Sequence, residues 1–269
     1  SLVEQLTMEG KQLMNEDTVR KLIEMKMSGM ADSYKQQSQH KDYQSLDFEE
    51  RFMILVDTEY SRRKSNKLQR LINQAKFDIP GASISEILYF EDRKLPKELI
   101  LRLASGVYLE NKNNIILMGA TGAGKTYLAN ALGIEACRQF YKVFYTRLPE
   151  LLDEFKVAKN QPDDSYKKLM RKIMRYELLI IDEWLLHDLT EEELYLTMEI
   201  IERREKTSST IFCTQMSTEG WHHKLGSGPT GEAIIDRIVH NSHQITIDGE
   251  ISMRERTGMS AHPLGDENV

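Results

Sequence analysis

The sequence lacks most of the features that mark secreted, membrane-spanning or disulfide-stabilised proteins. Its 269 residues include only two cysteines, Cys137 and Cys213. Both lie in apolar surroundings without a CxxC pair, which favours structural thiols in a reducing, cytoplasmic setting. No apolar run approaches the roughly 18 residues that a membrane span needs, and residues 1–12 show neither the basic segment nor the apolar core of a secretory signal. The composition, with 40% hydrophobic residues and six prolines, indicates a soluble globular chain.

Acids outnumber basic residues overall, but positive charge is concentrated locally. The formal net charge is −6, which taken alone argues against a nucleic-acid partner, although a net value hides how charge is distributed. Two segments, residues 60–77 and 166–176, carry basic residues and no acid. The first contains Arg62, Arg63, Lys64, Lys67, Arg70 and Lys76, and the second contains Lys167, Lys168, Arg171, Lys172 and Arg175.

Residues 1–76 are expected to form a small all-helical N-terminal domain. After a cap at Asn15 or Asp17, apolar residues recur at helical spacing until Gly29 breaks the run, and a second helix is expected over about 30–39. Asp47 and Glu50 have the spacing of a capping box. They precede a long helix that is expected to end near residue 75.

The rest of the chain alternates short apolar strands with helices. Pro80 and Gly81 end the long helix and fall in a predicted linker over residues 77–96. Strands are predicted at 115–119, 142–146, 176–183, 209–215 and 243–248. Such alternation implies right-handed crossovers and a parallel five-stranded sheet covered by helices on both faces. We therefore expect an α/β module over residues 97–258, followed by a tail over residues 259–269.

The segment GATGAGKT, residues 119–126, stands between a predicted strand and a predicted helix. It fits G-x-x-x-x-G-K-[ST], in which glycines let backbone N–H groups surround an anion at the positive end of a helix. Lys125 is expected to reach the β- and γ-phosphates of ATP, and the Thr126 hydroxyl to bind Mg²⁺. A chance match is the alternative, but the flanking strand and helix argue against it. The predicted ATP-binding set is Gly119, Ala120, Thr121, Gly122, Ala123, Gly124, Lys125, Thr126 and Tyr127.

Two acids follow the aliphatic run of the third strand, in LLIIDE. Asp182 is expected at the carboxyl end of this buried strand, where α/β proteins bind ligands, and would hold Mg²⁺ through its water shell. Glu183 would polarise the attacking water. The alternative is an ordinary strand with two acids at its exposed end. The Asp-Glu pair favours hydrolysis over binding alone, and no NKxD guanine-reading motif is present.

Four further polar residues are predicted to serve the same site. Thr214 and Gln215 end the fourth strand and would help to place the water, or they mark only a strand-to-loop transition. Arg237 would neutralise charge in the site of a neighbouring subunit, or it forms a surface salt bridge with an acid such as Asp236. Arg254, in SMRER, is a further predicted contact for the phosphates.

The order of these motifs resembles the AAA+ ATPases of the initiator clade. Within that clade the chain resembles the IstB-type transposition helper ATPases, which are related to the DnaC helicase loaders. The resemblance runs from about residue 18 to 256, and it includes KLIEMKMSGMADSY, RRKSNKLQRLINQAKF and TRLPELLDEFKVA. It implies a P-loop AAA+ ATPase that forms a homo-oligomer with ATP between subunits, so that Arg237 acts in trans. It also implies binding to duplex target DNA and recruitment or activation of a transposase.

The resemblance also points to a DNA contact within residues 148–175. Initiator-clade proteins insert an extra helix here and use it to grip DNA, and this segment is long enough for two helices. One helical face carries Lys167, Arg171 and Arg175 at i, i+4 and i+8, with Lys168 and Lys172 beside them. Such a face suits phosphate contacts without base reading, and a solvated face is the alternative. The cluster at 62–70 is a second DNA candidate, or a docking surface for acids on a neighbour.

Two other functions stay open. A helicase loader with the same fold would bind single-stranded DNA and a replicative helicase. A nucleotide-gated adaptor would not turn over ATP, and Glu183 argues against it. A metal site at Trp221, His222 and His223 lacks supporting cysteine or carboxylate spacing, so packing within a loop is expected for this segment.

Overall fold

The computed structural model describes residues 14–249 and Met253. It divides into two compact units between Gln69 and Arg70, within the long helix α3 (Phe48–Ala75). Residues 77–96, expected as a linker, fall in the second unit. In the part of the chain that the structure describes, no helix is both long and apolar enough to span a membrane.

The described part of the first unit is helical, as the sequence predicts. Residues 14–24 are helical, and α2 (Ser28–Gln39) and a short 3-10 turn, η1 (Lys41–Ser45), precede α3. The predicted capping box at the start of α3 is confirmed, since the Glu50 N–H donates to Asp47 Oδ1 at 2.8 Å and the Asp47 N–H donates to Glu50 Oε2 at 3.0 Å. Two of the four orphan N–H groups at this end are thereby satisfied.

Gly29 does not separate two helices, which corrects the sequence-based prediction. The break falls at residues 25–27, and Gly29 lies in the first turn of α2, where its N–H donates to Glu59 Oε2 at 2.7 Å. A Cβ at position 29 would lie 2.9 Å from Glu59 Cα. Glycine is therefore used here for the close approach of α2 to α3.

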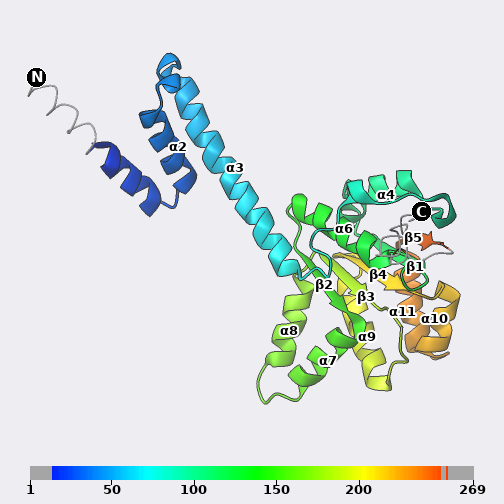
Figure 1. Ribbon diagram of the computed structural model, residues 1–269. Helices are drawn as coiled ribbons and strands as arrows, with labels where there is room; N and C mark the ends of the chain where they lie inside the picture. The colour runs from blue at the N-terminus through cyan, green and yellow to red at the C-terminus, as the bar shows by residue number, and fades with distance from the viewer. Residues whose placement is uncertain (1–13, 250–252, 254–269) are drawn as a thin grey trace, which may run out of the picture. The chain divides into compact units, whose positions relative to one another are not determined.

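A parallel five-stranded sheet forms the second unit, with strand order β2-β3-β4-β1-β5 (Figure 1). All four neighbouring pairs are parallel, which confirms the predicted α/β class. The strands are β1 (Asn114–Gly119), β2 (Val143–Arg147), β3 (Leu178–Asp182), β4 (Ser209–Thr214) and β5 (Ser242–Ile247). Every residue of β3 and β4 is buried, as expected for strands covered on both faces.

Helices cover both faces of this sheet (Figure 1). On one face lies α6 (Lys125–Arg138), packed so closely that a Cβ at Gly133 would be 2.8 Å from Ile180 Cδ1. The opposite face carries the main apolar cluster, in which Ile116, Leu179 and Phe212 meet five helices. These are α7 (Leu148–Lys159), α8 (Ser165–Met174), α9 (Glu191–Arg204), α10 (Thr218–Leu225) and α11 (Pro229–Val239). Two short helices, α4 (Lys97–Ala104) and α5 (Val107–Glu110), precede β1.

Trp221 packs as expected but belongs to a helix rather than a loop. It lies in α10 and is fully buried, with its ring centroid 5.7 Å from that of Trp184 and 6.4 Å from that of Phe212. The aromatic cluster fixes the segment that follows β3 against the segment that follows β4. Both segments begin at the carboxyl edge of the sheet, where the site described below is built.

Candidate functional site

A glycine-rich loop, residues 119–124, joins the end of β1 to the start of α6. Gly119 is required by a close approach, since a Cβ there would lie 2.6 Å from the Ile247 carbonyl oxygen of β5. Gly124 has φ +101°, a left-handed conformation that residues with a Cβ rarely adopt. The first N–H groups of α6 have no helical acceptor. Loop and helix together therefore present N–H groups to one anion-binding position.

Lys125 folds back over this loop. Its Nζ donates to the carbonyl oxygens of Gly119 at 2.6 Å and Ala120 at 2.8 Å. The side chain is only 8% exposed, and this burial lowers the pKa of Lys125 below its usual value. These two hydrogen bonds hold the amine beside the loop. A phosphate bound there could replace the two carbonyls as its acceptor, because a phosphate is a stronger acceptor for an ammonium group than a carbonyl is.

Asp182 is the centre of a hydrogen-bond network at the end of β3. Its Oδ2 accepts from Thr126 Oγ1 at 2.6 Å and from the Tyr145 hydroxyl at 2.7 Å. Its Oδ1 accepts from the Glu183 N–H at 2.8 Å. The network places a hydroxyl oxygen and a carboxylate oxygen side by side at the start of α6, and this donor set suits a hard divalent cation such as Mg²⁺.

Glu183 stands just beyond β3 in a strained conformation, with φ +53°. The next residue returns to the sheet, since the Trp184 N–H donates to the Cys213 carbonyl of β4 at 2.8 Å. The Glu183 carboxylate is 40% exposed and lies 3.5 Å from Arg147 Nε at the end of β2. The left-handed conformation of Glu183 belongs to the turn after β3, and its carboxylate lies at the edge of the sheet.

The two polar residues after β4 differ in their surroundings. Thr214 is buried, and its Oγ1 accepts from the Met216 N–H at 3.2 Å. Gln215 is exposed. Both lie at the carboxyl edge of the strand that separates β3 from β1, which is the edge that carries Asp182.

Arg237 lies at the opposite edge of the sheet. It shares a hollow with Asn114 and Asn241, which stand at the amino-terminal ends of β1 and β5. Its Nε is 3.2 Å from Glu205 Oε2 without the alignment of a hydrogen bond, and its Nη2 is 3.6 Å from Glu202 Oε1. Arg237 is therefore remote from the glycine-rich loop of its own chain, which follows the carboxyl end of β1.

Two predicted contacts remain, Arg254 and Tyr127. Arg254 is outside the described residues, while the neighbouring Met253 N–H donates to the Gly122 carbonyl at 2.9 Å. Tyr127, predicted to contact ATP, accepts the Ser83 N–H at its hydroxyl at 3.1 Å and lies 3.3 Å from Glu86. The Tyr127 side chain thus holds residues 83–86 against α6. Only the backbone of Tyr127 remains as a candidate contact for ATP.

Sequence reasoning missed three residues of this region: Arg93, Tyr145 and Arg147. Arg93, in the turn η3 (Glu91–Arg93), donates from Nη2 to the Ala123 carbonyl at 3.0 Å. Tyr145 and Arg147 come from β2, whose register places Arg147 opposite Asp182. The sequence could not have identified Tyr145 and Arg147 as site residues, because local spacing does not show that β2 is the neighbour of β3.

The basic residues of residues 166–176 lie on α8 and its end, and all five side chains are exposed. We name Lys167, Lys168, Arg171, Lys172 and Arg175 the α8 cluster. Lys167 is 3.8 Å from Asp164, in an ion pair in which both side chains are exposed. The opposite side of α8 is apolar and buries Met170 and Ile173 in the core. The helix therefore turns its charged face outward.

The second predicted basic set lies on α3, and all of it except Arg70 belongs to the first unit. We name Arg62, Arg63, Lys64, Lys67 and Arg70 the α3 cluster. Arg62 donates to Asp32 at 2.7 Å and Arg63 to Glu59 at 2.6 Å, while Lys64 Nζ lies 4.5 Å from the centre of the Tyr60 ring. Two of its arginines therefore serve contacts within the helical unit.

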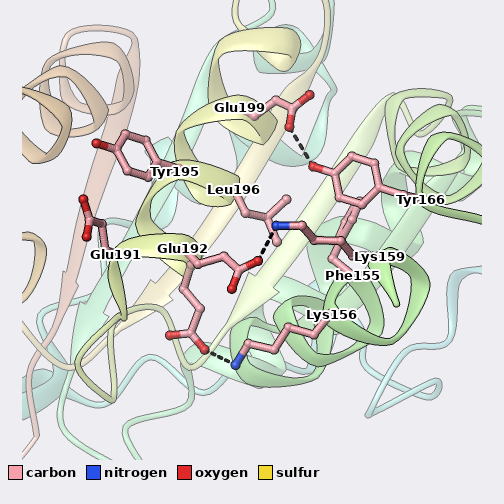
Figure 2. Close-up of a pocket in the computed structure, with 10 residues that line it drawn as sticks. Phe155, Lys156, Lys159, Tyr166, Glu191, Glu192, Tyr195, Leu196 and Glu199 are labelled. Atoms are coloured by element: carbon pink, nitrogen blue, oxygen red, sulfur yellow. Dashed lines mark hydrogen bonds and ion pairs between the residues drawn. The ribbon is translucent and has the colours of Figure 1, made fainter. Parts of the chain in front are cut away.

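A groove of about 490 Å³ lies between α7, α8 and α9, and none of the predicted site residues lines it (Figure 2). Lys156 of α7 pairs with Glu193 of α9 at 2.5 Å, and a second pair joins Lys159 to Glu192. The Tyr166 hydroxyl of α8 donates to Glu199 of α9 at 2.7 Å. These contacts cross the groove and hold the α7–α8 pair against α9.

Comparison with known proteins gives relatives along nearly the whole chain. The sequence profile of the IstB-like ATP binding proteins matches residues 20–261. A Sinorhizobium fredii protein named as an insertion sequence ATP-binding protein, y4pL, is 32% identical over 239 residues, which cover 89% of this chain and 96% of the relative. The protein named as the ATP-binding protein of insertion sequence IS1162 from Pseudomonas fluorescens is 34% identical over 204 residues, covering 76% of this chain and 87% of that protein.

Solved structures share the fold at lower identity. The DnaC helicase loader superposes with a TM-score of 0.55 at 18% identity, covering 62% of this chain and 97% of that chain. AMPPCP-bound DnaA from Aquifex aeolicus gives a TM-score of 0.54 at 17% identity, covering 66% of this chain and 53% of that one. The five-stranded sheet with its glycine-rich loop is thus an AAA+ P-loop fold. With a family match over residues 20–261, the chain belongs to the IstB-like ATP binding protein family.

Proposed function

We propose that this protein is a Mg²⁺-dependent ATP hydrolase. The observation that carries the proposal is the 2.6 Å contact between Thr126 Oγ1 and Asp182 Oδ2, which brings two hard oxygen donors together beside the glycine-rich loop. Oxygen donors of this kind are the ligands that Mg²⁺ takes in nucleotide sites. The name of the family supports ATP as the nucleotide.

Each residue of the site has a separate proposed role in hydrolysis. The loop N–H groups and Lys125 would bind the β- and γ-phosphates, with Lys125 leaving the carbonyls of Gly119 and Ala120. A Mg²⁺ ion held by Thr126 and Asp182 would neutralise charge on the same phosphates. Glu183 would accept a proton from the attacking water, and Thr214 or Gln215 would help to orient that water.

Arg237 is proposed to complete the site of a neighbouring subunit. It is remote from its own loop, is 27% exposed, and is held by two acids, Glu202 and Glu205, and by a hydrogen bond of 3.5 Å to the Ala233 carbonyl. An arginine in such a position can exchange its acid partners for the γ-phosphate of an ATP bound to a second copy. There it would speed hydrolysis by orders of magnitude. This role requires a homo-oligomer with ATP between subunits. Arg254 is a further proposed contact for these phosphates.

The biological role proposed is the delivery of a transposase to duplex DNA in the cytoplasm. Two relatives are named for insertion sequences, which connects the family with mobile DNA. The exposed α8 cluster is the proposed contact for the phosphate backbone, without base reading. Binding of this kind should weaken steeply with salt, because each phosphate contact releases counterions.

The test combines phosphate release with fluorescence anisotropy. Labelled duplex and single-stranded DNA are titrated with the wild type and with Glu183→Gln, each without nucleotide, with ADP and with ATP. Glu183→Gln should lower phosphate release at least about 100-fold, the usual effect of losing a general base. It should keep ATP bound and stabilise the duplex complex.

Each alternative function has its own signature in this experiment. ATP-dependent binding to duplex DNA supports the transposition role, whereas preference for the single strand would favour a helicase loader. Unchanged phosphate release by Glu183→Gln would instead indicate a nucleotide-gated adaptor. Absence of binding to either DNA would refute the assignment of the α8 cluster.

A further inference from the structure

Arg93 places a buried guanidinium against the glycine-rich loop. The residue is 6% exposed. Its Nη2 donates to the Ala123 carbonyl at 3.0 Å, and its Nη1 donates to the Leu88 carbonyl. Its own carbonyl accepts the Asp248 N–H at 3.2 Å, so the backbone that carries Arg93 is tied to the end of β5. This charge has no part in the proposed hydrolysis.

The contact with Ala123 fixes the direction of the next peptide N–H. In a trans peptide the carbonyl of Ala123 and the N–H of Gly124 point in opposite directions. A carbonyl held toward Arg93 therefore turns the Gly124 N–H away from Arg93. Without this restraint the peptide could rotate easily, because glycine readily exchanges between left-handed and right-handed conformations.

The fit between Arg93 and the loop is close. A Cβ on Gly124 would lie 2.7 Å from Arg93 Nη2, so the guanidinium occupies the space that a side chain would need. Glycine at position 124 thus has two effects. It allows the φ of +101°, and it leaves room for the Arg93 guanidinium. A charged donor is also the strongest available partner for a carbonyl in a buried setting.

We propose that Arg93 is a positioning residue for the phosphate chain of the nucleotide. It holds the Ala123–Gly124 peptide with the Gly124 N–H turned into the loop, and it places a fixed positive charge behind that loop. Lys125 binds phosphate from the front, while Arg93 acts through the backbone without touching the ligand. The inference rests on the proposed nucleotide site and adds to it a residue from the segment that the sequence marks as a linker.

The test measures the affinity of the full chain for a fluorescent ADP analogue. Arg93→Met removes the fork and the charge, and Arg93→Lys keeps the charge on a single nitrogen. The matched control is Lys94→Met, which removes one charge from the adjacent residue, whose side chain is 76% exposed and 4.0 Å from Asp248. Competition with inorganic tripolyphosphate reports on the loop without the adenosine, and thermal unfolding checks that each variant folds.

Loss of a charge-assisted hydrogen bond predicts about 10- to 100-fold weaker ADP binding by Arg93→Met. Arg93→Lys should recover part of that loss, and Lys94→Met should stay within about twofold of the wild type, as a screened surface charge would. Tripolyphosphate should lose as much affinity as ADP does. If Arg93→Met destabilises the fold, the test depends on Arg93→Lys. This variant must unfold at the same temperature as the wild type and still bind ADP more weakly.

Three results would overturn the inference while leaving the proposed function intact. Wild-type affinity in both Arg93 variants would show that the contact is incidental. Equal losses in Arg93→Met and Lys94→Met would point to a general field of positive charge. A loss for ADP but not for tripolyphosphate would assign Arg93 to the adenosine part of the ligand. A wild type that binds neither ligand would instead refute the proposed function itself, together with this deduction from it.

Discussion

The two basic clusters look alike in the sequence and differ in the structure. Each is a helical segment with five or more cations and no acid. In the α8 cluster every side chain is exposed, and the ion pair of Lys167 with Asp164 is long, at 3.8 Å. In the α3 cluster, Arg62 binds Asp32 of α2 at 2.7 Å, and Arg63 binds Glu59, one turn earlier in α3, at 2.6 Å.

This difference shows that local charge does not measure charge available to a ligand. A DNA phosphate that approaches Arg63 must compete with Glu59, a buried carboxylate that also accepts from Gly29 and Met30. A phosphate that approaches the α8 cluster meets exposed side chains with weaker local contacts, since Arg171 donates to the Lys167 carbonyl at 3.3 Å and Lys172 Nζ lies 5.7 Å from the centre of the Phe144 ring. It gains counterion release without displacing a short ion pair. The contrast therefore predicts that α8 dominates DNA binding, while α3 uses its arginines for its own fold.

The largest expected effect is on DNA binding by the α8 cluster. Substitution of Lys167, Arg171 and Arg175 by alanine should weaken duplex binding about 100-fold near physiological salt and lower the salt slope by about 3, if three phosphate contacts are lost. Anisotropy titrations at several salt concentrations give both numbers. The matched control is the pair Lys156→Ala and Lys159→Ala in α7, whose amines are already paired with Glu193 and Glu192. A control that loses as much affinity as the triple variant would break the comparison.

The second prediction concerns the acid that holds Arg63. Glu59→Gln should lower the free energy of unfolding by about 1.5 kcal/mol, because a buried charge-assisted hydrogen bond is lost. Urea unfolding of the full chain, followed by circular dichroism, measures this. Glu49→Gln, a change at an exposed position in the first turn of the same helix, should cost no more than about 0.5 kcal/mol. Equal losses would mean that Glu59 is no more than a surface acid.

Glu59 also gives this comparison a pH dependence. The hydrogen bond from Arg63 keeps the pKa of Glu59 below its ordinary value of 4.5, against an opposing effect of burial. Because the folded pKa is depressed, the unfolded chain binds the proton more readily. The stabilisation is therefore complete above pH 4.5 and is lost as pH falls through the folded pKa. Glu59→Gln should remove this part of the acid sensitivity, which urea titrations between pH 3 and 6 would detect.

The third prediction asks what the α3 cluster retains for DNA. If Arg62 and Arg63 are committed to acids, then Lys64→Ala with Arg70→Ala should weaken duplex binding no more than about tenfold and should lower the salt slope by less than 2. The same titrations as for α8 provide the measurement. A loss equal to that of the α8 variant would restore α3 as a DNA surface of equal importance.

Features that depend on residue spacing within short segments could be predicted from the sequence. The alternation of apolar runs and helices gave the parallel α/β sheet, and the capping box of Asp47 and Glu50 marked the start of α3. The glycine spacing of residues 119–126 placed Lys125 and Thr126 at the start of a helix, and the end of the third strand placed Asp182 within reach of Thr126. Periodicity and fixed backbone geometry are enough for such inferences.

Contacts set by tertiary arrangement could not be predicted. Arg147 meets Glu183 only because β2 and β3 are neighbours in a particular register, and Tyr145 reaches Asp182 for the same reason. Arg93 reaches the glycine-rich loop because its own backbone is tied to β5. The identity of Gly29 as a packing residue likewise depended on Glu59, which lies 30 residues away. No local pattern encodes such pairings.

The smallest expected effect belongs to Arg62 and tests whether its commitment to Asp32 is structural. Both side chains are more than one third exposed, so water screens the pair and its coupling should be about 0.2–1 kcal/mol. A double-mutant cycle with Arg62→Ala and Asp32→Ala, measured by urea unfolding, gives that coupling directly. Arg62→Ala alone should change duplex affinity less than about twofold. If it lowers DNA affinity strongly while the coupling to Asp32 is zero, then Arg62 faces the nucleic acid and the distinction between the two clusters fails at this residue.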